Sequence, residues 1–358
     1  MFEQYSWYNK LPSESLPVCE ENLYSFFRTM YERQMIWKRR FLDHKERPWT
    51  EDAILATSKF TNVYRDLDRN SQWQIKHIIM DDELSLTNLV WKMMVFRFFN
   101  NPATFEFNAK EHPNSADLFN PAASISATDW RNGIPNYEEY DEDEFREFID
   151  GVRRSGINPF TTAYLINSMA APDMNRDDCY TRVVIPTLHR QLPKLMKTVM
   201  KAETPEDIID FLKTLPGVAD FIAHEFYQDF TYINKYTTRH FMRFTQDDYT
   251  NVGPGASVGI RLIFPNLKAR NQKSGIYRLR DMAAERLNEI GQTLGTPMPF
   301  LYWDKDSGTY YTTEECNITL HQIEMWLCEY QKYWKMVIGE GKQRSKFVPR
   351  TKELITKG

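Results

Sequence analysis

The sequence is poor in the features that mark several large classes of protein. Its 358 residues include four cysteines, Cys19, Cys179, Cys316 and Cys328, and no two of them are closely spaced, which argues against a disulfide framework or a zinc site of paired cysteines. It has no run of 18 apolar residues and no apolar signal segment, so we expect a cytoplasmic protein with no membrane partner. The net charge of −4 argues against a generally polyanion-binding chain, although it leaves room for a local basic groove.

Nucleotide and metal motifs are also missing. No Gly-x-x-x-x-Gly-Lys-Ser/Thr occurs, so the chain is not predicted to be a P-loop kinase. The run YEEYDEDE at residues 137–144 lacks the Gly and Asx spacing of a calcium loop, and a solvated helix is the simpler interpretation. We therefore expect no metal and no cofactor.

What the sequence does contain is helical periodicity, which predicts a mainly α fold with little sheet. Residues 1–20 are expected to form an irregular arm, 21–340 one helical unit and 341–358 a basic tail. The expected helices cover 21–42, 48–79 with Thr50 as the N-cap, 82–100, 137–154, 157–169, 180–201, 204–215, 218–229, 276–293 and 320–338.

The stretch Leu215–Asp229, LPGVADFIAHEFYQD, joins two of these helices by a tight turn. The Leu-Pro-Gly-Val turn resembles the helix-hairpin-helix of DNA glycosylases, near residues 204–230, in which backbone N–H groups hold a DNA phosphate. Gly217 and Val218 are thus predicted to contact a DNA backbone. In those enzymes an Asp follows the second helix, and Asp229 occupies a comparable place, which makes it the first candidate for a catalytic carboxylate. The alternative is an ordinary helical hairpin whose Asp caps the next turn.

Two further segments carry candidate phosphate ligands. On the long helix expected from Thr50, the residues Asn62, Arg65 and Arg69 share one polar stripe, and guanidinium groups bind phosphate in a bidentate fashion. The alternative is that both arginines pair with Asp66 or Asp68. In NVGPGASVGI, the backbone amides at Gly253 and Gly255 are expected near a phosphate, unless this is an ordinary Pro-Gly loop before a helix.

The last helix places Glu329 close to Trp326, Tyr330 and Tyr333 by helical spacing. Lys332 lies three residues from Glu329, so the two can also be a simple surface pair.

Three separated segments together resemble one family. They are PWTEDAIL…FTNVYRDLDR, LPGVADFIAHEFYQDFTY with VGPGASVGI, and LCEYQKYWKMVIGEGKQRSKF, which span about residues 30–345. They are similar to the α-glutamyl/putrescinyl thymine pyrophosphorylases of DNA-hypermodifying phages, also called amino acid:DNA transferases, which are related to the helical domain of 5-hydroxymethyluracil DNA kinases. This chain departs from the family at Val218-Ala219-Asp220, where a second Gly is more usual.

The resemblance implies an enzyme of phage thymidine hypermodification, working in the bacterial host cytoplasm. Its partner would be DNA containing phosphorylated 5-hydroxymethyluracil, and it would replace the phosphate with an amine from an amino acid or a polyamine. Such chemistry requires a flipped base, cations for the leaving phosphate and a carboxylate to take the amine proton. The rival functions are a DNA glycosylase acting on a modified base and a non-catalytic module that binds modified DNA.

Roles can be assigned to the candidate residues on this basis. Asn62, Arg65 and Arg69 are expected to bind the phosphate or the base. Asp229 is the first choice for the base that takes the proton, with Asp68 and Glu329 as substitutes. Lys332 or Arg33 is expected to hold the carboxylate of an amino-acid donor.

Overall fold

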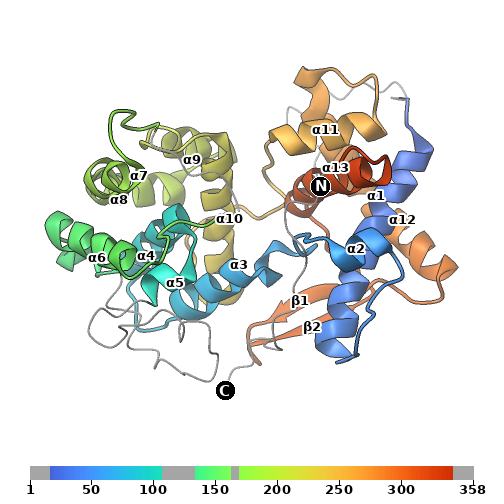
Figure 1. The fold of residues 1–358 in the computed structure, drawn as a ribbon, viewed down its shortest axis with the longest axis horizontal. Helices are drawn as coiled ribbons and strands as arrows, with labels where there is room; N and C mark the ends of the chain where they lie inside the picture. Colours follow the sequence, from blue (N-terminus) through green and yellow to red (C-terminus); the bar gives the residue numbers. More distant parts are fainter. Residues whose placement is uncertain (1–16, 107–133, 163–168, 342–358) are drawn as a thin grey trace. The chain divides into compact units, whose positions relative to one another are not determined.

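The computed structural model describes residues 17–106, 134–162 and 169–341 (Figure 1). The chain divides into two compact units. Unit 1 comprises Met1–Arg65 with Gln246–Gly358, and unit 2 comprises Asp66–Thr245. Helices dominate both units, which confirms the predicted mainly α class. Most of the expected N-terminal arm and nearly all of the basic tail lie outside the described residues, and the expectation of one functional unit over 21–340 stays a prediction.

Unit 1 packs three long helices around α13. Its elements are α1 (Glu20–Trp37), α2 (Ala53–Thr57), α11 (Pro254–Ile263), α12 (Gln272–Thr293), β1 (Phe300–Asp304), β2 (Thr309–Thr313) and α13 (Leu320–Val337). Phe26 of α1 lies edge-on to Tyr330 of α13 with ring centroids 5.6 Å apart, and the Trp326 indole donates to the Phe26 carbonyl at 3.2 Å. The strands form an antiparallel hairpin.

Helices α11 and α13 approach each other unusually closely. A Cβ atom at Gly259 would lie 2.3 Å from the Leu327 carbonyl oxygen, and one at Gly255 would lie 2.3 Å from the Cys328 Sγ. Both separations are far shorter than van der Waals contact, so only glycine fits at these two positions. Part of the glycine content of NVGPGASVGI therefore serves helix packing.

Unit 2 is built around the buried helix α4. Its helices are α3 (Arg69–Gln74), α4 (Leu86–Phe99), α5 (Pro102–Phe105), α6 (Glu142–Arg154), α7 (Arg176–Cys179), α8 (Ile185–Lys201), α9 (Pro205–Leu212) and α10 (Asp220–Tyr236). The sequence of α4 is apolar almost all round, as a helix in the core requires, and Phe98 packs edge-on against Phe226 of α10 with centroids 5.0 Å apart.

The turn between α9 and α10 forms as its sequence predicts. Thr204 and Asp207 make a capping box at the start of α9, with Pro205 in its first turn, which satisfies orphan amides there. Gly217 has a φ of +78°, a conformation that glycine adopts without strain. The chain thus turns from α9 into α10 at the predicted place.

The prediction of a long helix from Thr50 is wrong. Helix α2 is capped by Asp52, whose carboxylate accepts from the amides of Ile54 and Leu55, and it ends at Thr57. The chain then runs without helix as far as Tyr64, because Phe60, Val63 and Tyr64 are buried on this path. Asn62, Arg65 and Arg69 therefore share no helical stripe.

Two other expectations also differ from the structure. Helix α10 does not end beside Asp229 but continues to Tyr236, because its apolar side remains buried through Ile233. Asp229 is consequently a mid-helix residue and caps no following turn. The helix expected over 157–169 is absent from 157–162, and residues 163–168 lie outside the described part.

Candidate active site

One face of α13 carries a line of charged and thiol side chains. Glu324, Cys328 and Lys332 follow one another at four-residue spacing, which puts them on one side of the helix. The Gly253 amide donates to the Glu324 Oε1 at 3.2 Å, and Gly255 packs against Cys328. The α13 site, as we name it, consists of Arg65, Gly253, Gly255, Glu324, Cys328, Glu329 and Lys332.

The pKa of the Cys328 thiol depends on the charged side chains around it. Burial raises the pKa of the thiol to about 11, and Lys332 and Arg65 oppose this shift, whereas Glu329 and Glu324 add to it. Only charges near a group shift its pKa appreciably, so two cations and two carboxylates lie around one sulfur atom. The thiol stays protonated at neutral pH, which argues against a thiolate nucleophile here.

Glu329 is the buried carboxylate of the α13 site. The residue is 3% exposed, and its Oε1 accepts from the Lys332 ammonium at 2.5 Å. Its Oε2 is buried and has no hydrogen-bond partner among the described residues. Because an unsatisfied buried oxygen is costly, this oxygen is available to accept a proton or a donor group of a ligand. The Lys332 side chain, at 44% exposed, keeps the other end of the pair open to solvent.

Two other predicted residues of unit 1 pair with each other. The Arg33 guanidinium donates to the Asn62 Oδ1 at 2.7 Å. The neighbouring Glu32 is buried and accepts from Arg39 at 2.7 Å. Although burial raises the pKa of Glu32, hydrogen bonds from Arg39 and Thr50 lower it below its ordinary value. Arg33 and Asn62 thus lie beside a charged network that is already satisfied.

In unit 2, Asp229 belongs to a network of buried polar side chains. Arg97 of α4 donates to both carboxylate oxygens of Asp229, at 2.7 Å from Nε and 2.5 Å from Nη2. Gln74 donates to Asp229 at 3.1 Å, and Glu225 lies 3.2 Å from Arg97. The buried Arg97 network, as we name it, is Gln74, Arg97, Glu225 and Asp229.

The environment of Asp229 is typical of an internal ion pair. The residue has no exposed surface. Burial raises the pKa of its carboxyl, and Arg97 opposes that shift. Arg97 was not predicted as a site residue, yet a single Arg in the apolar run LVWKMMVFRFF is a signal, since a buried charge needs a partner.

The remaining predicted residues of unit 2 lie at or near the starts of helices. Asp68 is the N-cap residue of α3, and Arg69, the first residue of α3, is exposed. At the α9–α10 turn, the Val218 amide donates to the Leu215 carbonyl at 3.2 Å. A phosphate bound at the start of α10 would therefore be held by the amides that follow Val218.

A second buried acid of unit 2, Asp66, was not predicted. Its Oδ2 accepts from the Lys235 ammonium and from the Tyr236 hydroxyl, both at 2.5 Å. The interpretation that Asp66 pairs with Arg65 or Arg69 missed this, because Lys235 lies 169 residues away in the sequence. No local spacing signals such a contact.

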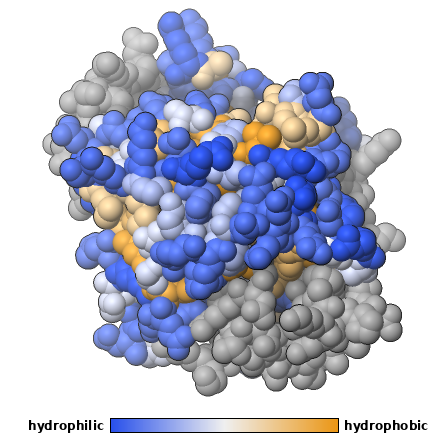
Figure 2. Space-filling view, turned by 90° about the vertical axis from the view of Figure 1, so that its left-hand side faces the viewer, coloured by the Kyte–Doolittle hydropathy of each residue, from blue (hydrophilic) through white to orange (hydrophobic). Residues whose placement is uncertain are grey.

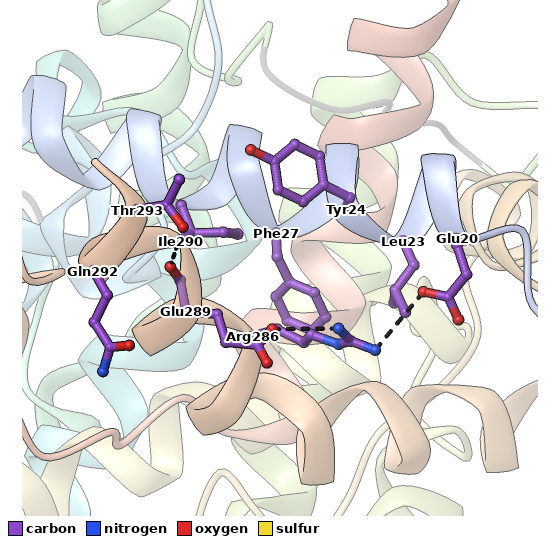
Figure 3. Close-up of a pocket in the computed structure, with 9 residues that line it drawn as sticks. All are labelled: Glu20, Leu23, Tyr24, Phe27, Arg286, Glu289, Ile290, Gln292 and Thr293. Carbon is purple, nitrogen blue, oxygen red and sulfur yellow. Dashed lines mark hydrogen bonds and ion pairs between the residues drawn. The ribbon is translucent and has the colours of Figure 1, made fainter. Parts of the chain in front are cut away.

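Unit 1 also has an open pocket of about 370 Å³ between α1 and α12, drawn in Figure 3. Phe27 and Leu23 are buried in its wall. On its rim, Arg286 lies 3.7 Å from Glu20 and 3.3 Å from Glu289. The guanidinium is thus already shared between two carboxylates, and the pocket contains none of the residues predicted from the sequence.

The sequence of the chain matches a known protein family. The model of the family described as "5-hmdU DNA kinase, helical domain" matches residues 20–343. The chain belongs to this helical-domain family. The match includes every candidate residue named above, from Arg33 to Lys332.

A relative within the helical-domain family is the 5-hmdU DNA kinase of Bacillus phage SP10. It is 25% identical over 325 residues, which are 88% of this chain and 45% of the phage protein. The chain therefore spans less than half the length of this relative. No solved structure matches the chain.

Two further properties of the described residues concern metals and membranes. Within residues 17–106, 134–162 and 169–341, no three His, Cys, Asp or Glu side chains come together in a way that could hold a metal ion. In the same part of the chain, none of the helices is both long and apolar enough to span a bilayer.

Proposed function

We propose that this protein is an amine transferase that acts on DNA. Its substrate would be phosphorylated 5-hydroxymethyluracil, whose phosphate is replaced by an amine from an amino acid or a polyamine. Membership of the helical-domain family supports a role in 5-hydroxymethyluracil chemistry. The resemblance of three of its segments to the amino acid:DNA transferases favours a step that uses the phosphorylated base over a step that makes it.

The observation that carries the proposal is the gathering of opposite charges in the α13 site. Departure of phosphate from the 5-methylene carbon breaks a C–O bond, and the electron pair leaves with the phosphate. Arg65 and Lys332 are the cations proposed to stabilise that developing charge. Both cations lower the pKa of the same thiol, that of Cys328. We therefore propose that both can bind one phosphate group.

The incoming amine forms the new C–N bond and must lose a proton. We assign that proton to Glu329, because its Oε2 is buried and has no partner among the described residues. A positioned carboxylate base contributes roughly 10²–10⁴-fold to such a step. Asp229 and Asp68 remain the alternative bases to test, although both oxygens of Asp229 already accept from Arg97.

The base must leave the duplex before any of this can happen. Backbone amides that follow Gly217 and Val218, and those of Gly253 and Gly255, are the proposed contacts to DNA phosphates. Asn62 and Arg69, with Arg33, are the further proposed contacts to the base or its phosphate. Gly217 and Val218 precede α10, and Gly253 and Gly255 lie at the start of α11, where a helix N-terminus favours anions. Arg33 lies on α1, Asn62 follows α2, and Arg69 begins α3.

The decisive experiment is incubation with DNA containing 5-phosphomethyluracil and a pool of amino acids and polyamines. We expect a nucleoside whose mass equals 5-hydroxymethyl-2′-deoxyuridine plus the amine minus water, with one phosphate released per modified base. Free base and abasic sites would instead identify a glycosylase. Binding of the phosphorylated DNA with no phosphate released under any amine would identify a non-catalytic module.

A further inference from the structure

The solvent face of α8 carries a line of cations. Arg190, Lys194, Lys197 and Lys201 are all exposed and are separated by four, three and four residues, which keeps them on one side of the helix. The opposite side of α8 is buried through Leu188, Leu192, Leu195 and Val199. The α8 stripe, as we name these four cations, extends over roughly 16 Å at 1.5 Å per residue.

The α8 stripe lacks the acids that usually accompany surface cations. Residues 179–202 contain no Asp or Glu, although the chain as a whole has more acids than bases, 49 against 45. None of the four cations forms an ion pair with a residue that the structure describes. Arg190 donates a hydrogen bond to the Thr187 hydroxyl at 2.9 Å, and the Lys194 ammonium lies 5.5 Å from the centroid of the Phe211 ring. Exposed helices usually interleave charges of both signs, so this face keeps an unbalanced positive charge.

We infer that the α8 stripe binds the phosphate backbone of DNA. Phosphates along a strand advance about 3.4 Å per residue along the duplex axis, so the stripe matches about five successive nucleotides. The choice of DNA rests on the proposed function, while the charge pattern is independent of it. Such contacts would position the duplex and would not read its sequence.

A lipid surface is the less suitable partner for this face. A helix that lies on a membrane sets Trp, Phe or Leu beside its cations, whereas Met200 is the one large hydrophobic residue of α8 that is strongly exposed. The side of the molecule shown in Figure 2, which is the left-hand side of Figure 1 where α8 is drawn, presents mainly hydrophilic residues.

The test is a triple substitution, Lys194→Gln with Lys197→Gln and Lys201→Gln, in the full chain. Binding to unmodified 30-base-pair DNA is measured by fluorescence anisotropy across a salt series. Each lost phosphate contact should reduce the slope of log K against log salt by about 0.9, so the slope should become shallower by about 2.7. At 0.1 M salt the affinity should fall on the order of a hundredfold.

The matched control removes the same charge from scattered exposed lysines: Lys45→Gln, Lys76→Gln and Lys268→Gln. It should keep most of the affinity and slope of the natural protein. Equal losses in the two triple variants, or no loss in the α8 variant, would overturn the inference. So would a loss of binding to phosphatidylserine vesicles with DNA binding unchanged. Because no phosphorylated base or amine is present, the result stands apart from transferase activity, which is assayed separately.

Discussion

Two buried carboxylates, one in each unit, are paired in opposite ways. In unit 2, Asp229 has no exposed surface and both of its oxygens accept from Arg97. In unit 1, Glu329 is also buried, yet one of its oxygens has no partner in the described part of the chain, and the Lys332 that binds the other is 44% exposed. Internally satisfied charges fix a fold, whereas charges left partly unsatisfied beside solvent are available for chemistry.

The largest effect should follow from removal of the Arg97 guanidinium. Arg97→Met leaves Asp229 buried without a counter-charge, and breaking a buried pair costs about 3–5 kcal/mol. Lys332→Met removes the cation of the pair in unit 1 and should cost less than Arg97→Met, because the Lys332 side chain is 44% exposed and solvent already screens its charge. Urea denaturation of both variants measures the difference, and equal losses would break the comparison between the units.

This loss should also depend on pH. Burial raises the pKa of Asp229 and Arg97 opposes the rise, so the carboxyl in Arg97→Met has a still higher pKa. A raised acid pKa favours the folded state while the group is protonated and disfavours it once the group must ionise. The variant should therefore lose stability progressively as the pH rises above about 4, the ordinary Asp value, and its deficit should be smaller at pH 4 than at pH 7.

The next effect concerns turnover. Glu329→Gln keeps the shape of the side chain and removes the proposed base, so transfer to phosphorylated DNA should slow on the order of a hundredfold, with DNA affinity little changed. Asp229→Asn and Asp68→Asn serve as matched controls and should slow the reaction less. Single-turnover rates from nucleoside mass analysis across pH 6 to 9 decide between them. If Asp229→Asn slowed the reaction more than Glu329→Gln does, Asp229 of unit 2 would be the catalytic base.

A smaller effect is expected at the contact between α11 and α13. Gly259→Ala would push a methyl group to within 2.3 Å of the Leu327 carbonyl oxygen, and overpacking of this kind costs about 1–3 kcal/mol. Ser257→Ala, on the same helix, is the control and should change stability by less than about 0.5 kcal/mol. Thermal unfolding that gave the two variants the same midpoint would show that α11 can shift to relieve the clash.

The smallest effect should come from the start of α9 in unit 2. Thr204→Ala removes half of the capping box with Asp207 and should cost about 1 kcal/mol. Thr204→Ser retains the hydroxyl and should restore most of the loss. If the two variants were equally unstable in urea, the hydroxyl would not be the stabilising group.

Much of the fold is readable from the sequence where local signals agree. Apolar periodicity predicted α4, α12 and α13, and the Thr204-Pro205 signature with Pro216-Gly217 predicted α9 and its turn. The long helix from Thr50 failed because Asp52 competes as the cap and because Phe60, Val63 and Tyr64 gain more burial on a non-helical path. Tertiary burial overrode helical spacing there.

The site was predictable only in part. Glu329 and Lys332 were found because they are three residues apart on a strong helix. Partners that come from distant segments, such as Arg97 for Asp229 and Lys235 for Asp66, give no local spacing and need the fold to bring them together. Cys328 was visible as a cysteine, but its place among four charges depends on Arg65, which the fold brings to α13 from a distant segment.

The glycine contact between α11 and α13 also limits how unit 1 can move. With Gly255 and Gly259 set directly against the backbone and side chains of α13, neither helix can slide or roll along the other without a collision. The pair therefore behaves as one rigid body. Any opening of the α13 site to admit a nucleotide must come from side-chain rotation at Lys332 and Glu324, or from displacement of the segment around Arg65, and the amides at the start of α11 keep a fixed distance from Cys328 throughout.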